Sequence, residues 1–278
     1  MSNSLERFRI NGKVAVITGG AGFLGVRHAE AVLDAGGIPI LADINESVAK
    51  QRAADLSDQY NTEVPGFYAD ITTHKSVEEL CKMCTERFGK VDILINNAAN
   101  DPKVKQDEID SVPSSRFEAF PEMIWNKDIS VGLTGAYLCS QVFGKEMAKR
   151  NQGVILNIAS DLGIIAPDQR IYRVNGLPDE RQPVKPVTYS VVKHGMIGLT
   201  KYLATYWADK GIRVNALCPG GVYNGQPETF VRQLTNLIPM GRMAEADEYK
   251  PAIIFLVSDA SSYMTGASLS IDGGRTCW

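Results

Sequence analysis

The chain lacks the features that mark secreted, membrane-bound and nucleic-acid-binding proteins. Its 5 cysteines and 3 histidines among 278 residues are too few and too scattered for a disulfide framework or a metal site. It shows no signal peptide and no apolar run of membrane-spanning length. The formal net charge of −3 gives no electrostatic case for binding nucleic acid. We therefore expect a soluble, cytoplasmic protein without metal, membrane or nucleic-acid partners.

Two of the cysteines nevertheless have the spacing of a redox or zinc motif. Cys81 and Cys84 are separated by two residues, but no second cysteine pair or histidine pair accompanies them. They fall within a helical segment at 76–88, so we interpret them as part of a helix core.

What the chain does have is a regular alternation of strand-like and helix-like segments. With 44% hydrophobic and 22% charged residues, it can bury a full core as one domain over residues 1–278. Buried strands are expected near 13–18, 38–42, 64–68, 91–95, 153–158, 212–217 and 268–272. Helices are expected near 23–36, 45–60, 75–88, 121–150, 187–208 and 245–258. This alternation predicts an α/β fold, with a parallel sheet and helices on both of its faces.

The first expected strand runs straight into a glycine-rich turn. Lys13–Thr18 reads as a buried strand, and Gly19, Gly20, Gly22 and Gly25 follow before a helical stretch. Glycines let the backbone approach a pyrophosphate that lies on a helix N-terminus. The turn therefore indicates a dinucleotide-binding βαβ unit, although a plain tight turn would use the same residues.

Asp43 ends the second expected strand. A carboxylate at this strand end can accept hydrogen bonds from the ribose hydroxyls of adenosine, and it would repel a 2′-phosphate. Asp43 therefore favours NAD over NADP as the cofactor. The alternative is that it caps the helical segment that begins near Asn45.

Tyr189 and Lys193 stand four residues apart in a stretch that reads as helix. Side chains with this spacing lie on one helical face, so the ammonium can sit beside the phenol. A positive charge beside a phenol stabilises the phenolate and lowers the pKa of a tyrosine toward working pH. The pair predicts a general acid/base, though an ordinary surface pair would have the same spacing.

In their order along the chain, these motifs resemble those of the short-chain dehydrogenases/reductases. The matching segments are Thr18–Gly25, Asp43, Ala69-Asp70-Ile71, Asn96-Asn97-Ala98-Ala99, Asn157–Ser160, Tyr189 with Lys193, Pro219-Gly220 and Ser270–Gly274. The resemblance covers nearly the whole chain. It implies a doubly wound Rossmann-type domain with a seven-stranded parallel sheet in the order 3-2-1-4-5-6-7. It also implies a homotetramer or a dimer.

The resemblance further implies roles for the matching residues. Tyr189 would exchange a proton with a small-molecule substrate, Ser160 would bind the substrate oxygen, and Lys193 would assist the tyrosine. Ser160 could instead be a simple turn residue. The residues that would hold the cofactor, NAD rather than NADP, are Gly19, Gly22, Phe23, Leu24, Gly25, Asp43, Asp70, Ile71, Asn97, Ala98, Tyr189, Lys193, Pro219, Gly220 and Val222.

Two departures from the family pattern bear on catalysis. The glycine spacing T-G-x-x-G-x-x-G is similar to that of the branch containing sugar-nucleotide epimerases and dehydratases, and we interpret it as a local variant because the chain length fits the dehydrogenase branch. Gly132 stands where the family usually has an asparagine that holds a water for the lysine proton relay. Either the backbone or Ser130 substitutes for that side chain, or proton release is slower, or the protein is not an ordinary dehydrogenase.

A third departure is an insertion at about 167–186, over the expected substrate pocket. Arg170 and Arg173 in it suit a phosphate or carboxylate through forked hydrogen bonds. A solvated lid or a subunit contact is an equal alternative. Residues of about 224–240 are expected to form a mobile substrate lid. Asn224 at its entrance is a further pocket candidate, because the family has a threonine there that contacts the nicotinamide carboxamide.

The glycine turn, the insertion and the Pro-Val-x-Tyr-Ser approach to the lysine are similar to those of dehydrogenases of bacterial sugar biosynthesis, including enzymes of flagellin-modifying nonulosonate pathways. The predicted activity is an NAD-dependent interconversion of a secondary alcohol and a ketone on a sugar derivative that could be phosphorylated or nucleotide-linked. The alternatives are a 3-oxoacyl thioester reductase, a polyol dehydrogenase, or a catalytically weak member that senses a dinucleotide or binds a partner. The terminal Trp278 is expected at a subunit interface because of its large apolar area.

Overall fold

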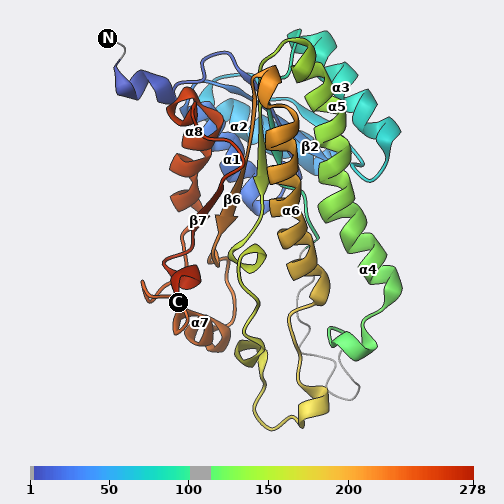
Figure 1. The fold of residues 1–278 in the computed structure, drawn as a ribbon, viewed down its shortest axis with the longest axis vertical. Coiled ribbons are helices and arrows are strands. Elements are labelled where there is room, and N and C mark those ends of the chain that lie inside the picture. The colour runs from blue at the N-terminus through green and yellow to red at the C-terminus, as the bar shows by residue number, and fades with distance from the viewer. Residues whose placement is uncertain (1–2, 101–113) are drawn as a thin grey trace.

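A parallel sheet of seven strands forms the centre of the molecule (Figure 1). The computed structural model describes residues 3–100 and 114–278. In this part of the chain the strands are β1 (Val14–Thr18), β2 (Ile38–Asp43), β3 (Gly66–Tyr68), β4 (Ile93–Asn96), β5 (Gly153–Ile158), β6 (Ile212–Pro219) and β7 (Ser268–Ile271). Their order is β3-β2-β1-β4-β5-β6-β7, so the predicted Rossmann-type sheet and its strand order are confirmed.

Helices cover both faces of the sheet and explain why its central strands are apolar throughout. One face carries α1 (Phe23–Asp34), α2 (Glu46–Tyr60) and α8 (Lys250–Val257), and the other carries α3 (His74–Phe88), α5 (Gly135–Lys149) and α6 (Val187–Tyr206). Strand β1 is buried along its whole length. Parallel pairing places Val16 between Ile40 of β2 and Leu94 of β4. A strand covered on both faces favours a continuous apolar run over an alternating one.

The cysteines at α3 belong to this core. Cys81 and Cys84 are buried in the apolar cluster between α3 and the sheet, as the helix-core interpretation predicted. Burial raises the pKa of the Cys81 thiol to about 11 and that of Cys84 to about 12. Both thiols are therefore protonated at neutral pH and poor nucleophiles.

One expected helix is interrupted. The stretch predicted at 121–150 consists of α4 (Glu122–Ile129), a π-helical turn η3 (Ser130–Thr134) and α5. Such π turns inside α-helices are rare and occur frequently at functional sites. The turn centres on Gly132, the residue that stands in the place of the family asparagine.

The insertion and the expected lid lie together at the end of the molecule where the strands terminate (Figure 1). The lid segment contains α7 (Glu228–Thr235), which the sequence did not lead us to expect. Ile171 of the insertion is buried in a small apolar cluster with Leu234 and Ile238 of the lid segment. The rings of Tyr172 and Phe230 are 5.7 Å apart between centroids. The two segments thus share a core of their own.

The described helices include none that is long and apolar enough to cross a membrane. Within residues 3–100 and 114–278, no group of three or more histidine, cysteine, aspartate or glutamate side chains could hold a metal ion. The terminal Trp278 is exposed in the single chain, and its indole Nε1 donates a hydrogen bond to the carbonyl of Leu237 at 3.2 Å. Its place in a subunit interface stays a prediction.

Candidate active site

The carboxyl ends of the strands open into a cavity of about 730 Å³. Parallel strands end at the same edge of a sheet, where ligands of such folds bind. The structure brings the predicted catalytic and cofactor residues, together with Asn224, to the wall of this cavity. They are Gly19, Gly22, Phe23, Leu24, Gly25, Asp43, Asp70, Ile71, Asn97, Ala98, Ser160, Tyr189, Lys193, Pro219, Gly220, Val222 and Asn224.

The glycine turn after β1 is packed too closely to accept side chains. A Cβ on Gly25 would lie 2.3 Å from the carbonyl oxygen of Gly19, and a Cβ on Gly19 would lie 2.9 Å from Cα of Ala98. Helix α1 begins after Gly22, and no side chain in the described part of the chain caps its first turn. Its leading N–H groups face the cavity edge and fit the pyrophosphate of a dinucleotide.

Thr18 and Asn97 fasten this turn to the loop after β4. The Thr18 hydroxyl accepts hydrogen bonds from the backbone N–H groups of Asn97 and Ala98, both at 3.1 Å. The Asn97 amide donates to the carbonyls of Thr18 at 3.0 Å and Gly19 at 3.1 Å. His28 of α1 is buried, and burial lowers the pKa of its imidazole to about 4. Its imidazole is therefore neutral at physiological pH and suits an uncharged core.

Asp43 lies beside the glycine turn at the end of β2. One carboxylate oxygen accepts a hydrogen bond from the N–H of Ala21 at 3.2 Å, and the other accepts one from the N–H of Asn45 at 3.0 Å. The cap of α2 is Asn45, whose side chain accepts from the N–H of Val48 at 3.2 Å. The helix-cap alternative for Asp43 is therefore wrong. Its carboxylate lines the cavity at the end where the glycine turn lies.

Tyr189 and Lys193 lie one turn apart near the start of α6. The Lys193 ammonium is 5.7 Å from the centroid of the Tyr189 ring and donates to the carbonyl of Ile158 at 2.8 Å. A second ammonium, that of Lys185 from the insertion, is 3.9 Å from the same centroid. Two cations thus flank one phenol, and a cation stabilises a phenolate.

Ser160 follows β5 and is held by its neighbours in the chain. Its hydroxyl donates a hydrogen bond to the Asp161 carboxylate at 2.7 Å and accepts one from the N–H of Leu162 at 3.2 Å. Asp161 in turn pairs with Arg275 at 3.1 Å, and both residues line the cavity. Sequence reasoning missed Asp161 and Arg275, because neither belongs to a matched motif and they come together only in the folded chain.

Gly132 is buried against the catalytic helix. A Cβ at this position would lie 2.6 Å from Cγ1 of Val192, the residue before Lys193. The π turn thus brings the backbone of η3 close to α6, and an asparagine has no room there without a shift of Val192. Close helix packing, rather than a side chain that holds water, accounts for this glycine.

We therefore expect Gly132→Asn to lower the free energy of unfolding by about 1–3 kcal/mol, the usual cost of overpacking a tight contact. The double variant Gly132→Asn with Val192→Ala has room for the new side chain and should recover part of that loss. Urea denaturation of the three proteins measures both effects. A single variant as stable as the wild type would show that η3 can move away from α6.

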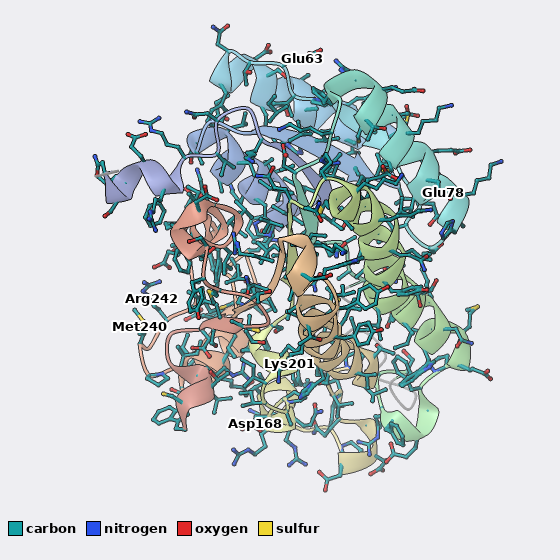
Figure 2. The ribbon with its side chains drawn as sticks, turned by 45° about the horizontal axis from the view of Figure 1, so that its top comes forward. Glu63, Glu78, Asp168, Lys201, Met240 and Arg242 are labelled. Atoms are coloured by element: carbon teal, nitrogen blue, oxygen red, sulfur yellow. The ribbon has the colours of Figure 1, made fainter. Side chains whose placement is uncertain are left out.

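The two arginines expected to bind substrate lie elsewhere. Neither Arg170 nor Arg173 is among the described residues that line the cavity. Arg170 is 81% exposed in its side chain and pairs with Asp168 at 2.6 Å, while Arg173 pairs with Asp179. Asp168 lies at the end of the molecule opposite Glu63 (Figure 2). The insertion reaches the cavity through Tyr172 and Lys185 instead.

The chain is similar to known proteins over nearly its whole length. A short chain dehydrogenase model matches residues 13–172, and an enoyl-(acyl carrier protein) reductase model matches residues 180–276. The D-threitol dehydrogenase of Mycolicibacterium smegmatis is 31% identical, over 97% of this chain and 95% of that protein. The NAD-dependent glycerol dehydrogenase of Listeria innocua is 32% identical, over 97% of this chain and 96% of that protein. A gluconate 5-dehydrogenase of Burkholderia cenocepacia, solved with NADP and tartrate, superposes with a TM-score of 0.85 at 28% identity, over 99% of this chain and 100% of that one.

Proposed function

Because this chain belongs to the short-chain dehydrogenase/reductase family and is thus an NAD(P)-dependent enzyme acting on CH–OH groups, we propose that it interconverts a secondary alcohol and a ketone of a polyol or sugar derivative, with NAD as its cofactor. One observation carries the proposal. Ser160, Tyr189 and Lys193 lie on the wall of the same cavity as the glycine turn and Asp43.

Each of the three catalytic candidates has a task that its surroundings support. A bound nicotinamide would supply the hydride transfer to or from the substrate carbon. Tyr189 takes up or supplies the proton of the substrate oxygen, helped by the flanking ammonium groups. Ser160 binds that oxygen and fixes its orientation. Lys193 is held by the carbonyl of Ile158 and so keeps its place beside the tyrosine and the expected nicotinamide ribose.

Asp43 supports NAD over NADP. Its carboxylate is already fixed by the N–H groups of Ala21 and Asn45, and its remaining acceptor capacity suits the ribose hydroxyls of adenosine. A 2′-phosphate in the same place would meet a negative charge that cannot move away. The similar glycerol dehydrogenase is named for NAD, whereas the superposed gluconate dehydrogenase was solved with NADP.

The wall of the cavity beyond Tyr189 supports a polyhydroxylated substrate. Tyr172, Lys185, Asn224 and Gln226 supply polar groups there, and Phe230 of the lid helix supplies an aromatic face. Alcohol groups of a polyol or a sugar can hydrogen-bond to such side chains. A phosphorylated or nucleotide-linked sugar is the second candidate, favoured by the ammonium of Lys185 rather than by Arg170 or Arg173.

We also propose a homotetramer or dimer. Tyr202 and Tyr206 stack on the outer face of α6 with ring centroids 5.8 Å apart, and both are more than half exposed in the single chain. Exposed aromatic pairs of this kind are typical of subunit contacts.

Binding of NADH and NADPH to the purified protein, followed by fluorescence titration, tests the proposed cofactor. We expect tighter binding of NADH, and we expect Asp43→Ala to weaken it about tenfold or more, because hydrogen bonds to a charged group contribute about 1.5–3 kcal/mol. The variant should also lose most of the preference over NADPH. Asp55→Ala, which removes an exposed carboxylate from α2, is the matched control and should change neither affinity.

A wild-type protein that prefers NADPH would contradict the role given to Asp43. Turnover of polyols, sugar acids and sugar phosphates is then measured from NADH formation. Binding of NADH without turnover of any of them would favour the alternative of a dinucleotide-sensing protein over the proposed dehydrogenase.

A further inference from the structure

A buried ion pair forms part of the wall of the active-site cavity. Arg275 Nη1 and Asp161 Oδ2 are 3.1 Å apart, and the two residues are only 6% and 3% exposed. Removing two charges from water is costly, and a buried pair is stable only when further hydrogen bonds hold it. The place of this pair beside Ser160 suggests a role beyond stability.

Asp161 connects the pair to the catalytic serine. Its Oδ1 accepts a hydrogen bond from the Ser160 hydroxyl at 2.7 Å and another from the N–H of Leu162 at 2.7 Å. Its Oδ2 faces Arg275. Both carboxylate oxygens thus accept hydrogen bonds, Oδ1 from Ser160 and Leu162 and Oδ2 from Arg275. Because Ser160 donates to Oδ1, a shift of the carboxylate would also move the serine hydroxyl.

The C-terminal turn is built to hold Arg275 in this place. Asp272 accepts hydrogen bonds from the N–H of Gly274 at 2.9 Å, from the N–H of Thr276 at 3.0 Å and from the Thr276 hydroxyl at 2.6 Å. Gly274 has a φ of 92°, a conformation that only glycine adopts readily. These contacts close the chain into a tight turn on either side of Arg275. The side chain of Arg275 therefore extends toward Asp161 from a backbone turn that these hydrogen bonds hold in place.

We infer that Arg275 is a positioning residue for the catalytic serine and acts through Asp161. With the arginine present, the charge of Asp161 is balanced, and its carboxylate stays in one position against the N–H of Leu162. Without it, the buried carboxylate would be unpaired and would hold the proton of the Ser160 hydroxyl more strongly than it does in the present structure, which leaves that proton less available to the substrate oxygen. The inference rests on the proposed function, because it assumes that Ser160 binds the reacting oxygen.

Kinetics of Arg275→Gln test the inference. We expect kcat to fall about 10- to 100-fold, while the dissociation constant of NADH changes by less than about twofold, since Arg275 acts on the serine and not on the dinucleotide. Arg275→Lys keeps the charge but not the planar guanidinium, and it should recover part of the loss. The decisive comparison is made in a Ser160→Ala background. There the further change Arg275→Gln should lower kcat by less than about twofold, because the group that it positions is gone.

An equal loss of kcat in both backgrounds would overturn the inference, because Arg275 would then act independently of the serine. If Arg275→Gln is too unstable for kinetics, Arg275→Lys provides the same comparison with and without Ser160.

Thermal unfolding gives a readout that does not depend on turnover. The double variant Asp161→Asn with Arg275→Gln should unfold at a higher temperature than either single variant, because it leaves no unpaired buried charge. If the two single losses simply add, the pair is not coupled and the inference fails. Absence of dehydrogenase activity in the wild type would refute the proposed function, and the inference would fail with it. An active wild type with equal losses of kcat in both backgrounds would refute the inference alone, so the two failures are distinguishable.

Discussion

Replacing Tyr189 by phenylalanine is expected to lower kcat about 1,000-fold, within the 10²–10⁴ range of general acid–base catalysis. The change removes the phenolic oxygen and leaves the ring that Lys185 and Lys193 flank. Steady-state kinetics measure kcat, and fluorescence titration should show that NADH still binds within about twofold of the wild type.

Tyr263→Phe is the matched control, because Tyr263 is fully exposed and is not among the described residues that line the cavity. It should leave kcat unchanged. A Tyr189→Phe variant that keeps a tenth or more of the wild-type rate would mean that another group transfers the proton. The role of Tyr189 would then be confined to binding.

Local spacing explains which parts of the site were predictable. The proximity of Tyr189 and Lys193 follows from helical geometry alone. The glycine turn is predictable because a strand-like segment, a run of glycines and a helical segment follow one another directly in the sequence. Asp161 and Arg275 are separated by 114 positions in the chain. No periodicity or motif relates them, because their contact depends on the order in which β5 and β7 join the sheet.

Arg170 and Arg173, expected at the substrate pocket, do not line the cavity, which shows that the charge of a residue in the sequence does not fix where its side chain lies. Both guanidinium groups could bind an anion. Instead they form ion pairs with Asp168 and Asp179, which lie close to them in the sequence. A short loop brings such opposite charges together at little entropic cost. Lys185 reaches the cavity because the insertion ends directly at the start of α6.

The interruption of the long helix was also beyond sequence reasoning. The sequence shows that Gly132 departs from the family pattern, but the reason for the glycine is its contact with Val192 on another helix. A contact between two helices depends on their crossing, which neither segment specifies alone.

Replacing Gly25 by alanine is expected to lower the free energy of unfolding by about 3 kcal/mol and to weaken NADH binding at least about tenfold. The new Cβ would lie 2.3 Å from the carbonyl oxygen of Gly19 and 2.8 Å from Cα of Gly20. Both neighbours are backbone atoms of the same tight turn, so no side chain can rotate away to make room. The turn must open, and the N–H groups at the start of α1 lose the arrangement that suits a pyrophosphate. Urea denaturation and NADH titration measure the two effects.

Gly198→Ala provides the control, because Gly198 lies exposed on α6 and a Cβ there would meet no atom within 4 Å. It should raise the free energy of unfolding by about 0.5–1 kcal/mol, as expected for alanine in place of a helical glycine, and leave NADH binding unchanged. The free energy of unfolding should thus fall in Gly25→Ala and rise in Gly198→Ala. Opposite changes would show that the loss at Gly25 comes from close packing and not from replacing a glycine by alanine as such. If Gly25→Ala binds NADH as well as the wild type does, the dinucleotide does not lie on the start of α1, and the proposed cofactor site loses its main support.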